Sequence, residues 1–577
     1  MCGIIFRIGL KDEFFDEKEW EELTRLNAQR GPNSQKEISL EIGNLSLRFF
    51  SSVLHLRGDH VAVQPHTDDQ NILCWNGEVF EGLPVSAVEN DGRGRTCLHH
   101  SMKIRPDRAI QHRKRKIYFG RDPLGRRSLV IRPGIEDRQY LTLASVSNGE
   151  KGYEEVPADK IFSISLSDED YQIQPVSRTT ISNHGSFAVP KPLRRDLPSL
   201  DYLPPTDPLS PIWEETVTKY IAHLEESVSL RTRDIPRHVS QGTNTARVSV
   251  MFSGGIDSSV VAFLAHRHIP LSEPIDLLNV AFENPRALEA DIHPSKTKKP
   301  KRQSEDAHED EKEAKKYSVP DRLTGLTQLE EFRRLAPERV WNFVEIDVPY
   351  EESTRYRSTI EQLMAPARTI MDLSLAQALY FASRGIGFIR KDSGEMISYT
   401  STARVILSGL GADELLGGYI RHRNVYKHAG WQGLLDELQL DVDRINTRNL
   451  GRDDRVISSH GKEARYPFLS MNLLAYLSSL PIYLKVDPRV VAVEQQDDIS
   501  SDAGANGTSD KGTSTVVHGL PGDKLLHRLA ARRLGLEGAA KRAKRAMQFG
   551  TRSACMEGTK GTKKIKGVEL LGGGPEV

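Results

Sequence analysis

Cysteine is scarce in this 577-residue chain, which contains only Cys2, Cys74, Cys97 and Cys555. These four residues match no zinc-ligand spacing, and so few thiols in a chain of this length exclude a disulfide-stabilised secreted scaffold. The N-terminus also has no signal or transit pattern. We therefore expect a protein of a reducing compartment, the cytoplasm.

Excess charge and long apolar runs are absent as well. The 79 Lys and Arg residues equal the 79 Asp and Glu residues in number, so no global field recruits nucleic acid or a membrane surface. No apolar run approaches the roughly 18 residues that a membrane-spanning helix needs. The partners are therefore expected to be small molecules, with no nucleic acid and no membrane among them. The sequence does not indicate an oligomeric state.

The strongest positive signal is the stretch 248–261, Val-Ser-Val-Met-Phe-Ser-Gly-Gly-Ile-Asp-Ser-Ser-Val-Val. An apolar, β-branched run enters a Ser-Gly-Gly turn, and an apolar run then leaves it at helical spacing. This pattern predicts a buried parallel strand followed by a helix. Gly254 and Gly255 let the backbone turn sharply, and the N–H groups that follow point out of a helix N-terminus, where anions are favoured. The loop suits a phosphate group, and Asp257 suits the Mg²⁺ that a phosphate brings.

No lysine follows these glycines, so the stretch is not the Gly-x-x-x-x-Gly-Lys-Ser/Thr phosphate loop. A bare Ser-Gly-Gly is also a common turn that binds nothing. The full Ser-Gly-Gly-x-Asp-Ser-Ser pattern between a strand and a helix instead resembles the loop of the ATP pyrophosphatases. Those proteins split ATP into AMP and pyrophosphate while they adenylate a substrate.

A second signal lies at the beginning of the chain, where Cys2 follows the initiator and precedes an apolar strand. Removal of Met1 gives Cys2 both a thiol and an α-amine, whose pKa of about 7.7–8.0 suits a general base for that thiol. The alternative is that Cys2 is a small apolar residue at the start of a strand.

Three motifs follow Cys2-Gly3 in order: Arg30-Gly31-Pro32-Asn33, Asn76-Gly77-Glu78 and Gly120-Arg121-Asp122-Pro123. Together they resemble the class II glutamine amidotransferase domain of the N-terminal nucleophile hydrolases. The resemblance implies an αββα sandwich in which Cys2 attacks the glutamine amide while Asn76 and Gly77 form the oxyanion hole. It also implies glutamine binding by Asn76, Gly77, Glu78 and Asp91, the last of which matches a family Asp that holds the α-amine.

The basic stretch 92–116 interrupts this pattern, because nothing in it alternates as a strand does. Members of the family have a core strand here. Three interpretations compete: a nuclear-localisation or nucleic-acid-binding patch, a solvated loop, and a mis-specified stretch such as a shifted reading frame. If the stretch belongs to the protein, the sandwich lacks a core strand, which counts against glutaminase activity.

A third signal is the stretch 405–419, in which a buried strand ends in Ser408-Gly409 and a helix begins near Asp413 and Glu414. In an open α/β sheet, ligands bind outside the carboxyl ends of the strands, so this strand end is expected to face the Ser253 loop across one crevice. Asp413 and Asp257 then share a Mg²⁺–pyrophosphate. The alternative is an acidic pair at a helix N-terminus, and for Glu414 alone that alternative is preferred.

With Glu463-Ala-Arg-Tyr-Pro-Phe-Leu469, the chain resembles glutamine-hydrolysing asparagine synthetase, and it is most similar to the branch of asparagine synthetase domain-containing proteins. The resemblance implies that glutamine supplies ammonia, and that ATP with Mg²⁺ adenylates aspartate for amidation to asparagine. It implies Mg²⁺ ligands at Asp257 and Asp413. The ATP-binding residues that it implies are Phe252, Ser253, Gly254, Gly255, Asp257, Ser258, Val280, Ser408 and Gly409.

The expected architecture combines an α+β part with an α/β part. Residues 1–175 form the amidotransferase sandwich, 176–210 a linker, and 211–550 a doubly wound α/β ATP-pyrophosphatase domain. The charged stretch 284–316 and the Asp-, Ser- and Gly-rich stretch 495–518 are expected to be disordered insertions, and 551–577 a disordered tail.

Two positions depart from the family pattern. Leu410 stands where a Glu is usual, and Ala546 stands where a Lys is usual, with Lys544 and Arg545 as the nearest cations. Three hypotheses follow. The chain is a working asparagine synthetase, an adenylating amidotransferase with another acceptor, or a pseudoenzyme that binds ATP as a scaffold. Aspartate-dependent formation of AMP discriminates among them.

Overall fold

The computed structural model describes most of the chain outside the two charged insertions. The described residues are 2–11, 16–68, 71–80, 110–111, 115–134, 140–168, 170–178, 190–206, 208–237, 245–283, 316–391, 393–490 and 519–556. Asp91, most of 92–116, the stretches 284–315 and 495–518, and residues 557–577 lie outside them.

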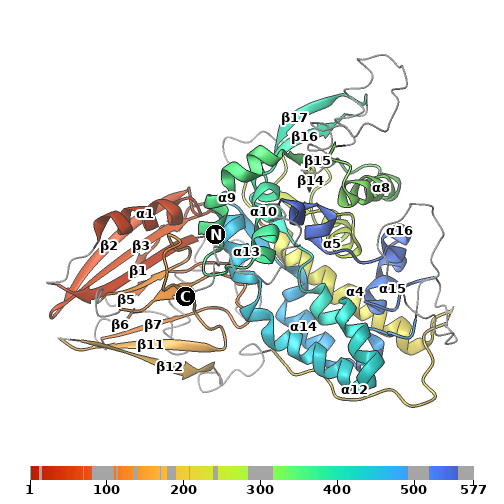
Figure 1. The fold of residues 1–577 in the computed structure, drawn as a ribbon, viewed down its shortest axis with the longest axis horizontal. Helices are drawn as coiled ribbons and strands as arrows, with labels where there is room; N and C mark the ends of the chain where they lie inside the picture. Colours follow the sequence, from red (N-terminus) through yellow and green to blue (C-terminus); the bar gives the residue numbers. More distant parts are fainter. Residues whose placement is uncertain are drawn as a thin grey trace, which may run out of the picture.

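Two six-stranded antiparallel sheets come from residues 2–177 and lie one above the other (Figure 1). The first has the strand order β10-β8-β9-β1-β3-β2, and the second has the order β12-β11-β7-β6-β5-β4. The strands of the first sheet are β1 Cys2–Leu10, β2 Ser34–Ile42, β3 Leu45–Val53, β8 Val130–Arg132, β9 Leu141–Ala144 and β10 Glu154–Glu155. Those of the second are β4 His66–Thr67, β5 Asn71–Leu73, β6 Ile110–Gln111, β7 Lys116–Gly120, β11 Lys160–Leu166 and β12 Tyr171–Ser177.

Strand β1 is buried on both faces because successive side chains point to opposite sides of the sheet. Phe6 belongs to the core between the sheets, which also contains Ile117 and Ile164 of the second sheet. Ile5 faces the other way, into a core with Trp20 of helix α1 (Glu17–Ala28). The N-terminal strand is therefore fixed from two sides.

The second sheet has its shortest described pairing in the region 92–116, where the sequence predicts that a core strand is missing. Between β5 and β7 the described part of the chain contributes only the two-residue strand β6, Ile110–Gln111. Strand β7 then pairs with β11 over five residue pairs, from Lys116 to Gly120. Regular strand pairing therefore resumes at β7, directly after the irregular stretch.

The third sheet has the order β17-β16-β15-β14-β13-β18-β19. Strands β15, β14, β13, β18 and β19 are parallel to one another. The hairpin β16–β17 pairs with β15 in the antiparallel direction. Its strands are β13 Val248–Met251, β14 Ile275–Phe282, β15 Trp341–Val348, β16 Ile386–Arg390, β17 Met396–Thr400, β18 Val405–Leu407 and β19 Glu463–Arg465. The strand order reverses between β13 and β18, and ligands of open α/β sheets bind at such a switch point.

Helices surround the third sheet and extend beyond it (Figure 1). They are α4 Pro211–Thr232, α5 Ile256–His266, α8 Pro320–Leu335, α9 Tyr350–Met364, α10 Ile370–Arg384, α11 Ala412–Leu416, α12 Ile420–Arg444, α13 Leu450–Ser458, α14 Met471–Ser479, α15 Leu525–Arg533, α16 Glu537–Lys541 and α17 Met547–Gly550. The alternating β–α order confirms the expected mixed α/β architecture. Among the described helices, none combines the length and apolar character needed to cross a bilayer.

Segments assigned by sequence to the linker and the tail make specific contacts where they are described. The Leu193 N–H donates to Gln439 Oε1 at 2.7 Å, and the Tyr202 ring lies 4.7 Å from that of Tyr483. Thr551 accepts a backbone hydrogen bond from Phe282 of β14, and a short 3₁₀ helix spans Ser553–Cys555.

Lys485 is fully buried, and its Nζ donates to the backbone oxygen of Leu477 at 3.2 Å. Burial lowers the pKa of Lys485 to about 7. The unfolded chain, with an ordinary pKa of about 10.5, therefore gains a proton on Lys485 as the pH falls from about 10 to 7, which favours unfolding. We expect Lys485→Met to raise the free energy of unfolding by about 2 kcal/mol at pH 7. Urea titrations should show this gain shrinking toward about pH 10, and a gain that is equal at both pH values would contradict the argument.

Candidate functional site

The first candidate site surrounds Cys2, which is buried at the start of β1 opposite Val53 of β3. The backbone N–H of Cys2 donates to Asn76 Oδ1 at 2.9 Å, and Gln64 Nε2 donates to Cys2 Sγ at 3.8 Å. The Oε1 of Gln64 accepts from the Trp75 N–H at 2.7 Å. Gln64 thus holds both the thiol and the segment before Asn76, a role that no sequence motif indicated.

The side chain of Asn76 has a free donor in the described part of the structure. Its Oδ1 is engaged by Cys2, and its buried Nδ2 has no hydrogen-bond partner among the described residues. Gly77 follows with φ +123°, where a Cβ would lie 3.3 Å from the side chain of Arg127. A buried amide donor beside a nucleophile is the arrangement that stabilises an oxyanion.

Glu78 lies between two arginines. Its Oε2 is 3.6 Å from Arg57 Nε and 3.4 Å from Arg465 Nη2. Burial raises the pKa of Glu78 to about 7, although the charge of Arg465 opposes this rise. Arg57 belongs to none of the sequence motifs, but the structure brings it to Glu78. The loop 54–68 carries both Arg57 and Gln64 back to the site, and only the fold reveals this.

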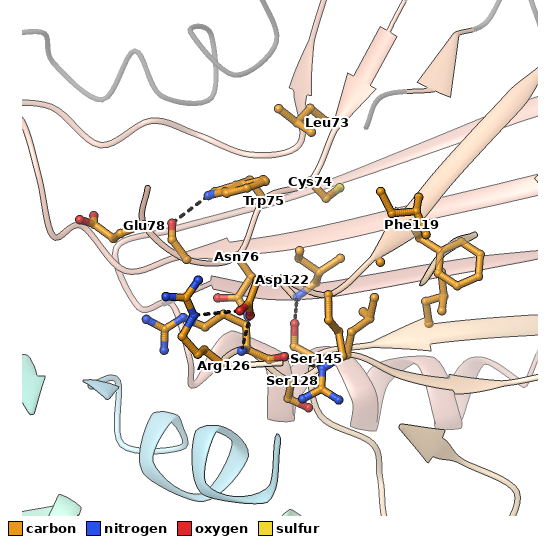
Figure 2. Close-up of a pocket in the computed structure, with 18 of the residues that line it drawn as sticks. Leu73, Cys74, Trp75, Asn76, Glu78, Phe119, Asp122, Arg126, Ser128 and Ser145 are labelled. Atoms are coloured by element: carbon orange, nitrogen blue, oxygen red, sulfur yellow. Dashed lines mark hydrogen bonds and ion pairs between the residues drawn. The ribbon is translucent and has the colours of Figure 1, made fainter. Parts of the chain in front are cut away.

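A cavity of about 230 Å³ opens beside these residues (Figure 2). Asn76, Gly77 and Glu78 line it together with Cys74, and its apolar part lies between the two stacked sheets. The apolar lining includes Phe6, Phe49, Ile72, Ile117, Phe119 and Leu143. Arg465 and Tyr466 also line the cavity. Because β19 ends at Arg465, the cavity joins the stacked sheets to the parallel sheet.

The second candidate site lies at the switch point of the parallel sheet. The loop from Ser253 to Gly255 connects β13 to α5, and Gly254 adopts φ +74°. A Cβ on Gly254 would lie 2.5 Å from the backbone carbonyl of Thr324, and a Cβ on Gly409 would lie 2.8 Å from the Cβ of Asp257. The end of β18 therefore faces the loop closely, as the sequence predicts, and neither glycine position has room for a side chain.

The remaining residues expected to bind ATP lie around the same loop. Phe252 and Val280 are buried in adjacent strands, with the Phe252 N–H donating to the Leu278 carbonyl. Ser258 Oγ donates to the Gly255 carbonyl at 3.1 Å, and Ser408 Oγ accepts from the Leu410 N–H at 3.2 Å. The N–H groups of the first turn of α5 have no partner within the helix, so they are available to an anion.

Asp257 and Asp413 converge on one ammonium group. Lys524 Nζ lies 2.8 Å and 2.6 Å from the two carboxylate oxygens of Asp257 and 2.6 Å from Asp413 Oδ1. Lys544 Nζ contacts the other oxygen of Asp413 and lies 4.1 Å from the ring centre of Tyr419. Burial by itself raises the pKa of Asp413, but the charges of Lys524 and Lys544 lower it below its ordinary value.

The two carboxylates fit a divalent cation only in part. No group of three or more His, Cys, Asp and Glu side chains in the described ranges is arranged to hold a metal ion. Asp257 and Asp413 do point at a common position, because both contact the same nitrogen of Lys524. Mg²⁺ commonly takes one or two carboxylates and completes its shell with phosphate oxygens and water. The pair therefore suits Mg²⁺ that arrives with a nucleotide.

The two cations nearest to Ala546 point to different carboxylates. Ala546 lies directly before α17, while Lys544, two residues earlier, supplies an ammonium group to Asp413. Arg545 acts elsewhere: burial raises the pKa of Asp321 to about 7, and the charge of Arg545 opposes that rise. Glu414 is buried and accepts a hydrogen bond from Tyr419 Oη at 2.5 Å. Leu410 is partly buried against the core and provides no carboxylate.

Buried ion pairs join the first site to helix α13. Asp454 of α13 accepts from Arg30 Nη2 at 2.8 Å, from the Ser128 N–H at 3.0 Å and from Arg127 Nη1 at 3.2 Å. Arg30 also donates from Nε to the Cys2 carbonyl at 3.2 Å and from Nη1 to Ser458 Oγ at 2.5 Å. The backbone of the candidate nucleophile is thus connected to a helix beside the parallel sheet.

Comparison with known proteins agrees with this architecture. The asparagine synthase family matches residues 238–334 and 424–495, which include the Ser253 loop and helix α13. The chain belongs to the asparagine synthetase family. It is 35% identical to asparagine synthetase domain-containing protein 1 of Homo sapiens over 96% of each chain. It is 34% identical to the protein of the same name from Gallus gallus, over 96% of this chain and 98% of the other. A protein of Saccharomyces cerevisiae, also named asparagine synthetase domain-containing, is 30% identical over 94% of this chain and 90% of its own.

Proposed function

We propose that this protein is a glutamine-dependent asparagine synthetase of the cytoplasm, with ATP and Mg²⁺ as cofactors. The observation that carries the proposal is the cavity that both halves of the molecule line, with Asn76–Glu78 from the part that forms the stacked sheets and Arg465 from the part that forms the parallel sheet. Arg465 is the last residue of β19, which pairs with β18. Ser408 follows β18 and donates its N–H to the Arg465 carbonyl. We infer that ammonia released at the first site would move through this cavity toward Arg465, which lies beside Ser408 of the second site.

At the first site, we infer that the two stacked sheets form an N-terminal nucleophile domain, in which removal of Met1 would give Cys2 a free α-amine beside its own thiol. The amine takes the thiol proton, and the sulfur attacks the side-chain amide of glutamine. Asn76 Nδ2 and the Gly77 N–H stabilise the resulting oxyanion. The amide nitrogen leaves as ammonia, and water then releases glutamate from the thioester. Glu78 and Arg57 carry the charges that complement the α-amine and α-carboxylate of glutamine.

At the second site, the N–H groups of the Ser253 loop and the first turn of α5 bind the phosphates of ATP. The aspartate β-carboxylate attacks the α-phosphorus, and the bond to pyrophosphate breaks. Lys524 and Lys544 would neutralise charge on the leaving pyrophosphate. Asp257 and Asp413 would hold Mg²⁺, which would supply Lewis-acid stabilisation. Ammonia then displaces AMP from the acyl group and gives asparagine.

The decisive test supplies ammonium instead of glutamine, because ammonium tests the second site independently of the first. Purified protein with a mature Cys2 N-terminus is incubated with ATP, Mg²⁺, aspartate and ammonium, and AMP and asparagine are measured. We expect equal amounts of the two products, and we expect AMP formation to depend on aspartate. Glutamine should then replace ammonium.

A scaffold function is the second candidate, and Leu410 is the observation that favours it, because an isobutyl group cannot replace a substrate-facing carboxylate. ATP binding without any AMP formation would support the scaffold and refute the synthetase. AMP formation that depends on an acceptor other than aspartate would instead indicate an altered acceptor pocket around Leu410. A Leu410→Glu variant that gains aspartate-dependent AMP formation would identify this position as the cause.

A further inference from the structure

Lys524 is built into the position where the two carboxylates of the second site converge. Its side chain is 1% exposed, and its Nζ contacts both oxygens of Asp257 and one oxygen of Asp413. The backbone of Lys524 adopts φ +52°, a left-handed conformation that non-glycine residues rarely adopt. It stands directly before α15, so the helix start fixes the direction of this side chain.

The surrounding residues pack closely around this lysine. A Cβ on Gly418 would lie 2.3 Å from Lys524 Cε and 2.0 Å from Asp413 Oδ1, so glycine at this position makes room for the contact. On the other side, His527 Nε2 lies 3.5 Å from Asp257 Oδ1, and its Nδ1 shares a hydrogen bond with Tyr220 Oη at 2.9 Å. The ammonium is therefore enclosed.

The four groups in direct ionic contact carry balanced charges without a metal. Asp257 and Asp413 contribute two negative charges, and Lys524 and Lys544 contribute two positive charges. A divalent cation at the same position has to displace the Lys524 ammonium or accept its repulsion at close range. Phosphate oxygens change this balance, because they offer the ammonium new partners and bring the metal with them.

We propose that Lys524 is a tethered cation that holds Asp257 and Asp413 together and excludes free Mg²⁺ from the site until a nucleotide brings the metal. This inference rests on the proposed ATP site. It assigns Lys524 a positioning role: the ammonium keeps the carboxylates converged while the site is empty, and it moves to the phosphates when ATP binds. Metal and nucleotide are then bound together and not one after the other.

Binding of Mn²⁺ in the absence of nucleotide tests this role, measured by electron paramagnetic resonance of the free ion. The full-length protein should show no tight site for Mn²⁺ alone. Lys524→Met should bind Mn²⁺ at least about tenfold more tightly, because the competing charge is gone. The double variant Lys524→Met/Asp257→Asn should lose that gain. Lys485→Met removes another buried ammonium that contacts no carboxylate among the described residues, and it should behave as the unmodified protein.

Mn²⁺ should also raise the melting temperature of Lys524→Met more than that of the unmodified protein, since a ligand stabilises the state that binds it. If Lys524→Met does not fold even with Mn²⁺, Lys524→Gln takes its place with the same expectation. Unmodified protein that binds Mn²⁺ alone as tightly as either variant would overturn the proposal. Binding of ATP–Mg²⁺ is measured separately, so failure of the proposed ATP site is distinguished from failure of the Lys524 role.

Discussion

Replacement of Cys2 by alanine is expected to lower glutamine-dependent asparagine formation by more than about 10³-fold, because it removes the thiol that the α-amine would activate. The thiol lies beside Gln64, and the Cys2 nitrogen donates to Asn76. The same variant should form AMP and asparagine at an unchanged rate when ammonium is supplied. Parallel assays with glutamine and with ammonium measure the two halves of the reaction in one protein.

Two further variants sharpen this result. Cys555→Ala removes an exposed thiol of the 3₁₀ helix Ser553–Cys555 and should leave both assays unchanged. Asn76→Ala removes the unengaged donor Nδ2 and should lower the glutamine-dependent rate by about 10²–10³-fold. If Cys2→Ala retained its glutamine-dependent activity, Cys2 would be no more than a buried residue at the start of β1.

Asp454→Asn is expected to reduce the free energy of unfolding by about 3–5 kcal/mol, because it leaves two buried guanidinium groups without their shared carboxylate. Asp454 is fully buried, and its partners Arg30, Arg127 and Ser128 all come from the half of the chain that forms the stacked sheets. Urea denaturation followed by tryptophan fluorescence measures the loss. The two halves should also begin to unfold separately, which would appear as a second transition.

The matched control is Asp436→Asn, which removes a carboxylate paired with Arg195 on the exposed surface of α12. Solvent screens such pairs, so its denaturation curve should coincide with that of the unmodified protein. A small loss for Asp454→Asn, equal to that of Asp436→Asn, would show that the buried ion pairs do not hold the two halves together.

Local sequence patterns predicted the parallel sheet and the close approach of the end of β18 to the Ser253 loop. The runs before Ser253 and before Ser408 are short, apolar and followed by glycine, and these features force buried strands that end at a turn. Local patterns did not predict that Asn76 lies near Cys2, and only the family resemblance implied it. Residues from different sheets meet according to strand register and packing, which local patterns do not describe. The contact between Cys2 N and Asn76 Oδ1 depends on both.

Other parts of the site were beyond local reasoning. Lys524 follows a Gly- and Asp-rich stretch and looks like an ordinary solvated lysine, yet the fold buries it between Asp257 and Asp413. Lys544, two residues before Ala546, reaches the carboxylate of Asp413, whereas the sequence named it only as one of two nearby cations. Arg57 and Gln64 arrive through a loop whose path no periodicity describes. In each case, a contact between segments that are distant in the sequence determines where the side chain lies. No local sequence pattern indicates such a contact.

The contacts of Arg30 predict which mutations should have similar phenotypes. One guanidinium holds the carbonyl of Cys2 and, at the same time, the carboxylate of Asp454 and the hydroxyl of Ser458. Alleles that alter α13 should therefore resemble alleles that alter the N-terminal cysteine, since both disturb the position of the same peptide. In a strain that depends on this protein for asparagine, both classes should grow poorly on glutamine as nitrogen donor, and mild alleles of either class should be rescued by ammonium.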